Sequence, residues 1–165
     1  MNPGDAPKFM MDQMLITVGK YLRICGHDAE WDTGATRHEL IVRANAEGRI
    51  FVTCTQRPLD EKPVPAKSLK LEVGDPVEQF HEIIRAFGLD TTGRLFTKCI
   101  RCNVALDDVA DNEAIREKVH PNVFAQHSKF YRCPKCGTVF WRGSHVVNTC
   151  RKLGLSFPKD EPEAA

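Results

Sequence analysis

The sequence predicts an α/β domain with a mostly parallel sheet, followed by a small cysteine-rich unit. Between residues 8 and 88, short apolar segments alternate with longer segments in which apolar residues recur at helical spacing. Strands and helices that alternate in this way are typical of a sheet covered by helices. After residue 94, four of the seven cysteines form two Cys-x-x-Cys pairs. The length of 165 residues suits one domain with a small appendage.

The first predicted strand, residues 8–12, ends on a carboxylate. A buried, unpaired carboxylate is costly, so Asp12 needs a partner, a metal ion or water. A helix with an apolar face is predicted to follow, because Met14, Val18, Leu22 and Cys25 recur at helical spacing, and Gly26 stands where this helix would end. Residues 27–31 are predicted to contain a second short strand.

The next two predicted elements are a helix over residues 36–48 and a strand over residues 49–54. Thr36 and Glu39 have the spacing of a capping box, and apolar residues follow at helical intervals. The strand, RIFVTC, is apolar on both faces, which suits a central position in a parallel sheet. Ligands bind beyond the carboxyl ends of the strands in such sheets, so Asp12 is expected to face a crevice there.

A proline-containing loop leads to the last strand and helix of this domain. Residues 68–73 alternate as a strand does, and Asp75 and Pro76 open a helix over residues 75–88. We therefore predict an α/β domain, a ribbon with a C-terminal helix and an acidic tail, at residues 1–93, 94–157 and 158–165.

The two Cys-x-x-Cys pairs predict one structural zinc site per chain. Each pair can present two thiolates to one tetrahedral ion, and a closed set of four leaves no open position for chemistry. Gly137, directly after the second pair, suits the turn that such a pair requires. Two disulfides or a redox pair are the alternatives, and without an export signal they are disfavoured. The predicted ligands are Cys99, Cys102, Cys133 and Cys136. The remaining thiols, Cys25, Cys54 and Cys150, are expected to be buried bystanders.

Charge is distributed unevenly along this chain. Residues 1–93 carry 11 Lys and Arg against 14 Asp and Glu, whereas residues 94–157 carry 11 against 5. An acidic part suits cation binding and a basic part suits a polyanion, with solvated surface charge as the simpler alternative. No stretch approaches the ~18 apolar residues that span a bilayer. No secretory signal is visible, so a cytoplasmic protein without membrane attachment is expected.

Four stretches carry a resemblance to a known family: KFMMDQMLITVGKYLRICGHD, HELIVRANAEGRIFVT, CIRCN and FYRCPKCGTVFWRGSH. Through them, residues 8–154 resemble the PIN-like RNase family known from the C-terminal domain of the Mut-seven exonuclease. The resemblance implies a PIN-like α/β domain followed by a zinc ribbon, and metal-dependent cleavage of RNA with Mg²⁺ or Mn²⁺. In PIN-like nucleases, clustered carboxylates hold such an ion, which activates a water and neutralises charge on the phosphate.

The resemblance implies catalytic roles for Asp12 and Glu39, which match two acids of the family, and Thr55 could add a hydroxyl ligand. Two other expected acids are missing. Cys54 and Thr55 stand where the family usually has arginine and aspartate, and Arg37 stands where it tends to have aspartate. Fewer carboxylates should hold a divalent ion more weakly. Local alternatives stay open, with Asp12 as a helix cap and Glu39 as only a capping-box member.

Two loop acids, Asp60 and Glu61, could supply a missing carboxylate, although loop acids are usually just solvated. The ribbon interleaves basic and aromatic residues, as a surface that contacts phosphates and stacks bases requires. The expected RNA-binding residues are Arg101, Arg132, Lys135, Trp141, Arg142 and His145. The same stretch includes Lys98, Lys129, Phe130, Tyr131 and Phe140. The alternatives are an aromatic ribbon core, which is favoured for Phe140, and, for His145, a capping role in the last helix.

The sequence therefore predicts a metal-dependent ribonuclease with a structural zinc ribbon that helps bind RNA, in single-stranded form. A catalytically degenerate copy that binds RNA or a protein is the alternative, because two expected acids are replaced. A zinc-ribbon accessory factor in a larger complex is a third. Nothing in the sequence indicates an oligomeric state.

Overall fold

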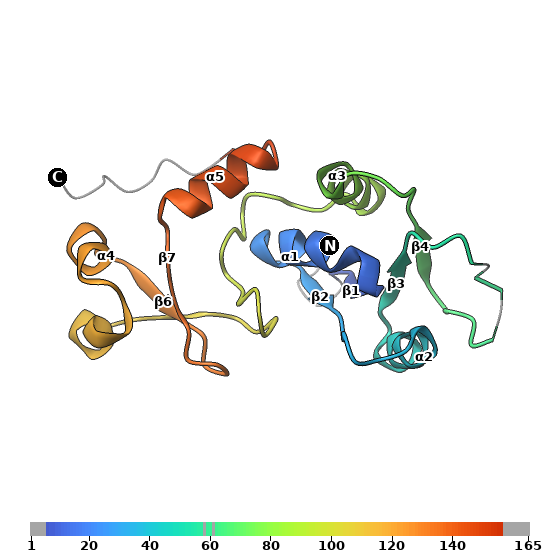
Figure 1. Ribbon diagram of the computed structural model, residues 1–165, viewed down its shortest axis with the longest axis horizontal. Coiled ribbons are helices and arrows are strands. Elements are labelled where there is room, and N and C mark those ends of the chain that lie inside the picture. The colour runs from blue at the N-terminus through green and yellow to red at the C-terminus, as the bar shows by residue number, and fades with distance from the viewer. Residues whose placement is uncertain (1–5, 58, 61, 157–165) are drawn as a thin grey trace. The chain divides into compact units, whose positions relative to one another are not determined.

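The computed structural model describes residues 6–57, 59, 60 and 62–156 (Figure 1). The chain divides into two compact units between Phe96 and Thr97, close to the domain boundary expected after residue 93. Glu61 and the expected acidic tail at 158–165 lie outside the described residues.

The first unit is built on a parallel sheet of four short strands. Their order is β2-β1-β3-β4, and every neighbouring pair is parallel. The strands are β1 (Lys8–Met11), β2 (Asp28–Glu30), β3 (Ile50–Thr53) and β4 (Ser68–Lys70). β3 lies between two neighbours and all four of its residues are buried, as expected from its two apolar faces. The predicted α/β class with a parallel sheet is confirmed.

The helices of this unit begin and end at residues with the expected capping chemistry. They are the 3₁₀ helix η1 (Gln13–Leu15), α1 (Ile16–Ile24), α2 (Arg37–Glu47) and α3 (Pro76–Phe87). α2 ends at Gly48, whose φ of 66° lies in the left-handed region that favours glycine. The side chain of Asp75 accepts hydrogen bonds from the first turn of α3.

The expectation that Met14 belongs to the apolar face of the first helix is wrong. Met14 is 63% exposed. Residues 13–15 form a 3₁₀ turn rather than the first turn of α1. A 3₁₀ helix has three residues per turn instead of 3.6, so Met14 is out of phase with the apolar stripe of the α-helix. Val18 and Leu22 of α1 are buried as predicted.

A core cluster joins the sheet to α2. Met10 of β1 and Phe51 of β3 are fully buried and pack with Leu40, Ile41 and Ala44. The three α2 residues lie on one face of the helix because residues one, three and four apart share a side. α2 is thereby held against the sheet by the apolar pattern that predicted it.

Arg23 is a buried cation between α1 and β2. Its Nε donates to the carbonyl oxygen of Ala29 at 2.6 Å, and its Nη2 lies 3.3 Å from a carboxylate oxygen of Glu30. Its Cζ lies 3.6 Å from the centre of the Trp31 ring. The side chain of Arg23 is only 3% exposed, so its charge depends on these neighbours.

Replacing Arg23 by methionine is expected to lower the free energy of unfolding by about 2–4 kcal/mol, because it leaves a largely desolvated ion pair without its cation. A urea titration followed by circular dichroism measures the change. The matched control is Arg43→Met, because Arg43 pairs with Asp32 at 3.0 Å but both side chains are at least 40% exposed. Its loss should stay below about 1 kcal/mol. Equal losses in the two variants would contradict the prediction.

The second unit contains a three-stranded antiparallel sheet with the order β5-β6-β7. The strands are β5 (Asp107–Asp108), β6 (Phe130–Arg132) and β7 (Val139–Trp141). The long spacing between the cysteine pairs holds β5, the 3₁₀ helix η2 (Asn112–Lys118) and α4 (Pro121–Gln126), and α5 (Ser144–Lys152) follows β7. Phe130 packs with Ile115 and Val119 to form the core of this sheet.

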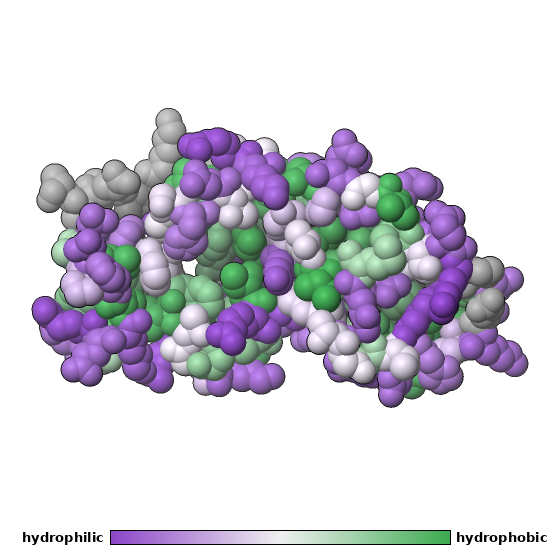
Figure 2. Space-filling model, viewed as in Figure 1, coloured by the Kyte–Doolittle hydropathy of each residue, from purple (hydrophilic) through white to green (hydrophobic). Residues whose placement is uncertain are grey.

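None of the helices in the described parts of the chain is long and apolar enough to cross a bilayer. On the face shown in Figure 2, hydrophilic residues are mixed with small hydrophobic patches. The exposed large hydrophobic side chains among the described residues are Met14, Val42, Val64 and Val73. Single exposed apolar side chains are ordinary on protein surfaces.

Candidate functional site

Asp12 lies at the carboxyl edge of the parallel sheet, directly after β1. Its backbone N–H donates to the carbonyl oxygen of Val52 at 2.9 Å, which extends the pairing of β1 with β3 by one residue. Its Oδ2 accepts a hydrogen bond of 2.7 Å from the hydroxyl of Thr53, the last residue of β3. Thr53 is fully buried, so its hydroxyl holds the carboxylate from a fixed position.

The local capping role considered for Asp12 is also present. Its Oδ1 accepts a hydrogen bond of 2.7 Å from the N–H of Gln13, at the start of η1. The Asp12 residue is half-buried, so its carboxylate is oriented by two donors and still reaches solvent. An oriented, accessible carboxylate of this kind is suited to binding a hard cation. Thr53 and Asp12 are far apart in the sequence. The pairing of β1 with β3 is what shows that their side chains touch.

The residues after β3 bring no carboxylate to this edge. Cys54 is 3% exposed, and burial, followed by the charge of Asp12, raises the pKa of its thiol. Cys54 is therefore a neutral neighbour of Asp12, as expected of a buried bystander. The N–H of Thr55 donates to Thr53 Oγ1 at 3.2 Å, and Thr55 Oγ1 accepts from the N–H of Arg57 at 3.3 Å. The Thr55 hydroxyl thus has a role in the turn.

Glu39 forms the predicted capping box at the start of α2. Its Oε2 accepts from the N–H and the hydroxyl of Thr36, at 2.7 and 2.8 Å, and its own N–H donates to Thr36 Oγ1 at 3.3 Å. The hydrogen bonds from Thr36 hold the pKa of Glu39 below its usual value. Glu39 is exposed and remains ionised, so it can act both as a cap and as an oxygen ligand.

A surface hollow of about 510 Å³ lies beside Glu39. It is lined by Asp32, Gly34, Ala35, His38, Glu39, Val42 and Arg43. The side-chain amide of Gln13 donates to the carbonyl oxygen of Ala35 at 2.8 Å. Gln13 therefore links the turn after Asp12 to the loop that precedes α2. The hydrogen bond therefore connects the segment that carries Asp12 with the loop before the helix that carries Glu39.

The structure does not bring the two acids into a larger carboxylate cluster. Within the described parts of the chain, three or more His, Cys, Asp or Glu ligand atoms come within 4.8 Å of one another only at the four cysteines. Arg37 directs its guanidinium toward the Phe51 ring, with Cζ 5.8 Å from the ring centre. Asp60 is exposed in its loop.

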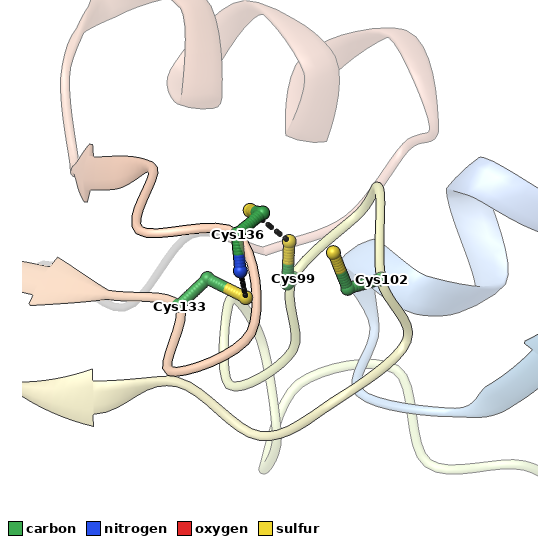
Figure 3. Close-up of side chains that lie close together, drawn as sticks. All are labelled: Cys99, Cys102, Cys133 and Cys136. Atoms are coloured by element: carbon green, nitrogen blue, oxygen red, sulfur yellow. Dashed lines mark hydrogen bonds between the residues drawn. The ribbon is translucent and has the colours of Figure 1, made fainter.

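The four predicted cysteine ligands lie together in the second unit. All four Sγ atoms are within 4.8 Å of one another, and those of Cys99 and Cys136 are 3.9 Å apart (Figure 3). Zinc–sulfur bonds of about 2.3 Å in a tetrahedron place sulfur atoms about 3.8 Å apart. The donor set and its spacing fit a structural zinc ion.

The two cysteine pairs form separate backbone turns of the same kind. The residue after each pair, Asn103 or Gly137, has a left-handed φ of 59° or 72°. The N–H of each of these residues donates at 2.9 Å to the carbonyl oxygen of the first cysteine of its pair. Gly137 was predicted in this role from the sequence, but Asn103 was not. Asparagine is the next residue after glycine to tolerate this conformation, and that property could have identified it.

The thiols of the cluster have opposing environments. Burial raises the pKa of Cys99 to about 12, and hydrogen bonding with Thr138 lowers the pKa of Cys136 to about 6. A buried thiolate at Cys99 needs a nearby positive charge, which a bound metal ion supplies. The chemistry of the donor set therefore agrees with the geometry.

The residues expected to bind RNA do not share one surface. Arg101 and Lys135 are exposed near the cysteine pairs. Arg132 is exposed but lines a hollow of about 380 Å³ together with Asp107, Asp108 and Asp111, so acids oppose its charge. Trp141 packs against the Phe130 core. The expected alternative, an aromatic ribbon core, therefore applies to Trp141. Phe140, for which it was favoured, pairs with Tyr131 and projects from the opposite face of the sheet.

His145 lies in the first turn of α5, with its ring 5.6 Å from the ring of Trp141. Partial burial of the ring, followed by the charge of His127, lowers the pKa of His145. Its imidazole is therefore neutral near pH 7 and can donate or accept a hydrogen bond, but it adds no positive charge for a phosphate. Gly143, rather than His145, is the residue that precedes the helix as its N-cap.

The chain thus combines an α/β domain, which has an oriented carboxylate at the carboxyl edge of a parallel sheet, with a unit whose four clustered cysteines suit a structural zinc ion. A family model described as "Mut7-C RNAse domain" matches residues 7–153. The chain belongs to this family, which confirms the resemblance to the Mut-seven C-terminal type. No curated protein matches the chain, and no solved structure does.

Proposed function

We propose that this protein is a metal-dependent ribonuclease of the PIN-like type with a structural zinc ribbon that helps bind RNA. The observation that carries the proposal is the Asp12 carboxylate, held at the carboxyl edge of the sheet by Thr53 and by the Gln13 N–H in a member of an RNase-domain family. Asp12 and Glu39 would hold Mg²⁺ or Mn²⁺. When bound, such an ion activates a water and neutralises charge on the phosphate.

The chain's own residues prepare this edge before any ion binds. Thr53 and the Gln13 N–H fix the direction of both Asp12 oxygens, so the carboxylate does not have to be ordered on binding. Burial and the charge of Asp12 raise the pKa of the Cys54 thiol, so this neighbour stays protonated and adds no negative charge to the site. Thr55 offers a hydroxyl in place of an acid, which supports weak rather than tight ion binding.

The ribbon contributes charge and, through its cysteines, order. Residues 94–157 carry 11 Lys and Arg against 5 Asp and Glu, which suits a polyanionic partner such as RNA. Cys99, Cys102, Cys133 and Cys136 would hold one structural zinc ion. Because the ligands must be reduced thiols, we place the protein in the cytoplasm.

The proposal is tested by cleavage of a labelled single-stranded RNA with the purified full chain. The protein is dialysed against metal-free buffer and assayed with no addition, with Mg²⁺ and with Mn²⁺. Cleavage is expected only when a divalent ion is added, and at millimolar rather than micromolar concentrations because few carboxylates are present. Equal cleavage without added ion, or none with either ion, would contradict the proposal.

The second candidate function is a catalytically degenerate module that binds RNA or a protein. It is favoured by the lack of a third carboxylate near Asp12 and Glu39 among the described residues. Thr55→Asp separates the two functions, because it adds a carboxylate two residues after Thr53, which already contacts Asp12.

If the chain is an active nuclease, Thr55→Asp should raise the cleavage rate at limiting Mn²⁺ by about 10-fold, because an added oxygen ligand tightens a hard-cation site. Thr55→Asn is the control, because asparagine has the size of aspartate but no charge, and it should leave the cleavage rate unchanged. A native chain that is inert while Thr55→Asp cleaves RNA would support the degenerate module instead. The measurement is the initial cleavage rate across a Mn²⁺ titration.

A further inference from the structure

The two faces of the β5-β6-β7 sheet carry different side chains. Phe130 pairs with Trp141 and Tyr131 pairs with Phe140 across β6 and β7. Because side chains alternate along a strand, Phe130 and Trp141 project from one face, and Tyr131 and Phe140 from the other. The sequence places aromatic residues next to one another, and the strand register separates them into two sets.

The first face is the core of the unit. Phe130 is 1% exposed and packs with Ile115 and Val119, and Trp141 packs against this cluster. The Phe130 ring also stacks on Phe124 of α4, with ring centres 6.1 Å apart. This face is therefore filled by the chain itself.

The second face combines aromatic rings with cations. Tyr131 and Phe140 are only half-buried there. Lys129 Nζ lies 5.8 Å from the centre of the Tyr131 ring, and Arg142 Cζ lies 5.9 Å from it. Lys129 and Arg142 are each two residues from an aromatic residue of this face, so the period of two brings all four side chains to the same side. One acid, Asp108, is paired with Tyr131 on β5.

Arg142 keeps hydrogen-bonding capacity in this arrangement. Its Nε is buried, and no acceptor for it is found within the described parts of the chain. An orphaned guanidinium N–H is costly unless a ligand supplies the acceptor. Arginine is well matched to phosphate because its planar group presents several donors at once.

We propose that Tyr131, Lys129 and Arg142 form a nucleotide site for single-stranded RNA, in which a base stacks on the Tyr131 ring while the two cations contact the adjoining phosphates. This inference rests on the proposed function, because it names the ribbon surface that receives the substrate. Cations beside an accessible ring on a sheet are the combination that single-stranded nucleic acid requires. An acidic peptide would meet the same charges but would gain little from the ring.

The proposal is tested by fluorescence anisotropy with a labelled ten-nucleotide oligouridylate. The full chain carries Asp12→Asn in every sample, so that cleavage cannot remove the probe. Tyr131→Leu removes the ring and should raise Kd by about 10-fold, within the range measured for loss of one base–aromatic stack. Tyr131→Phe keeps the ring and should stay within about 2-fold of the parent, because stacking needs only the π-face. Zinc content and circular dichroism show that each variant is folded.

The cations are tested through the salt dependence of binding. Lys129→Ala and Arg142→Ala should each flatten the slope of log Kd against log salt by about 0.7, the value for one phosphate contact on a single strand. Lys118→Ala is the matched control, because Lys118 is exposed at the end of η2 and should leave the slope unchanged.

The outcomes separate this inference from the function on which it rests. A parent chain that binds no oligouridylate would overturn both. A parent that binds while Tyr131→Leu binds equally well would overturn the stacking site alone. A slope of log Kd against log salt that is unchanged in Arg142→Ala would overturn the proposed phosphate contact, again without affecting the proposed function.

Discussion

Asp12→Asn is expected to reduce RNA cleavage at least about 100-fold, the scale on which loss of one electrostatic group at a reacting centre lowers catalysis. Asparagine has the same shape as aspartate. Its amide oxygen can accept from the Gln13 N–H and its NH₂ group can donate to the Thr53 hydroxyl, so η1 and the contact with Thr53 should survive. What disappears is the negative charge and one of the two oxygens that would hold the divalent ion. Single-turnover cleavage rates across a Mn²⁺ titration measure the effect, and raising Mn²⁺ should not restore the native rate.

The matched control for Asp12→Asn is Glu117→Gln. It removes the same unit of charge from an exposed position on η2, in the other unit, and should leave cleavage within about 2-fold, because the charge of a solvated side chain is largely screened by salt. Circular dichroism verifies that the Asp12 variant is folded. An Asp12→Asn chain that cleaves at the native rate would remove this carboxylate from the mechanism.

Cys133→Ser is expected to release the zinc ion and unfold the second unit. Binding of a structural zinc ion contributes about 10–16 kcal/mol in small domains, so loss of one ligand removes much of the folding free energy. The unit also has a small core centred on Phe130, which is unsuited to replacing that contribution. Elemental analysis should fall from one zinc per chain to well below one. Amide hydrogen exchange in β6 and β7 should accelerate to rates typical of an unfolded segment.

Cys150→Ser is the control for the cysteine prediction. Cys150 is buried in α5, in the same unit, but lies outside the four-thiol cluster. The variant loses one thiol and should retain one zinc per chain. A native chain without zinc, or a Cys133→Ser chain with its full zinc content, would refute the predicted metal site.

Local chemistry explains why much of the fold was predictable. The capping box of Thr36 and Glu39 begins α2 as expected, because the hydrogen bonds that define it join residues three apart. The apolar run of β3 predicted its central place, since only a strand covered on both faces can be apolar on both. The turns of the cysteine pairs were predictable for the same reason, because each turn is closed by a hydrogen bond between residues four apart.

Met14 shows where local reasoning failed. Its spacing fits the apolar stripe of α1, yet the 3₁₀ turn capped by Asp12 removes it from that stripe. A single turn of three residues is too short for the sequence to reveal whether its period is 3.0 or 3.6, so the sequence pattern did not distinguish a 3₁₀ from an α-helical first turn. Phe140 and Trp141 show a similar limit on β7, because neighbours in sequence lie on opposite faces of a strand and the sequence alone did not show which of them joins the core.

By itself, the sequence determined the elements, their caps, the pairing of cysteines within each turn and the family, because all of these depend on residues close together in the chain or on motifs quoted from it. Tertiary structure alone decided that Thr53 holds Asp12, that the two cysteine turns meet, and that Lys129 and Arg142 both approach the Tyr131 ring. Each of these contacts depends on strand register or on the approach of distant segments. Strand register and the approach of distant segments are set by the packing of a whole unit, and the local preferences of the residues do not determine them.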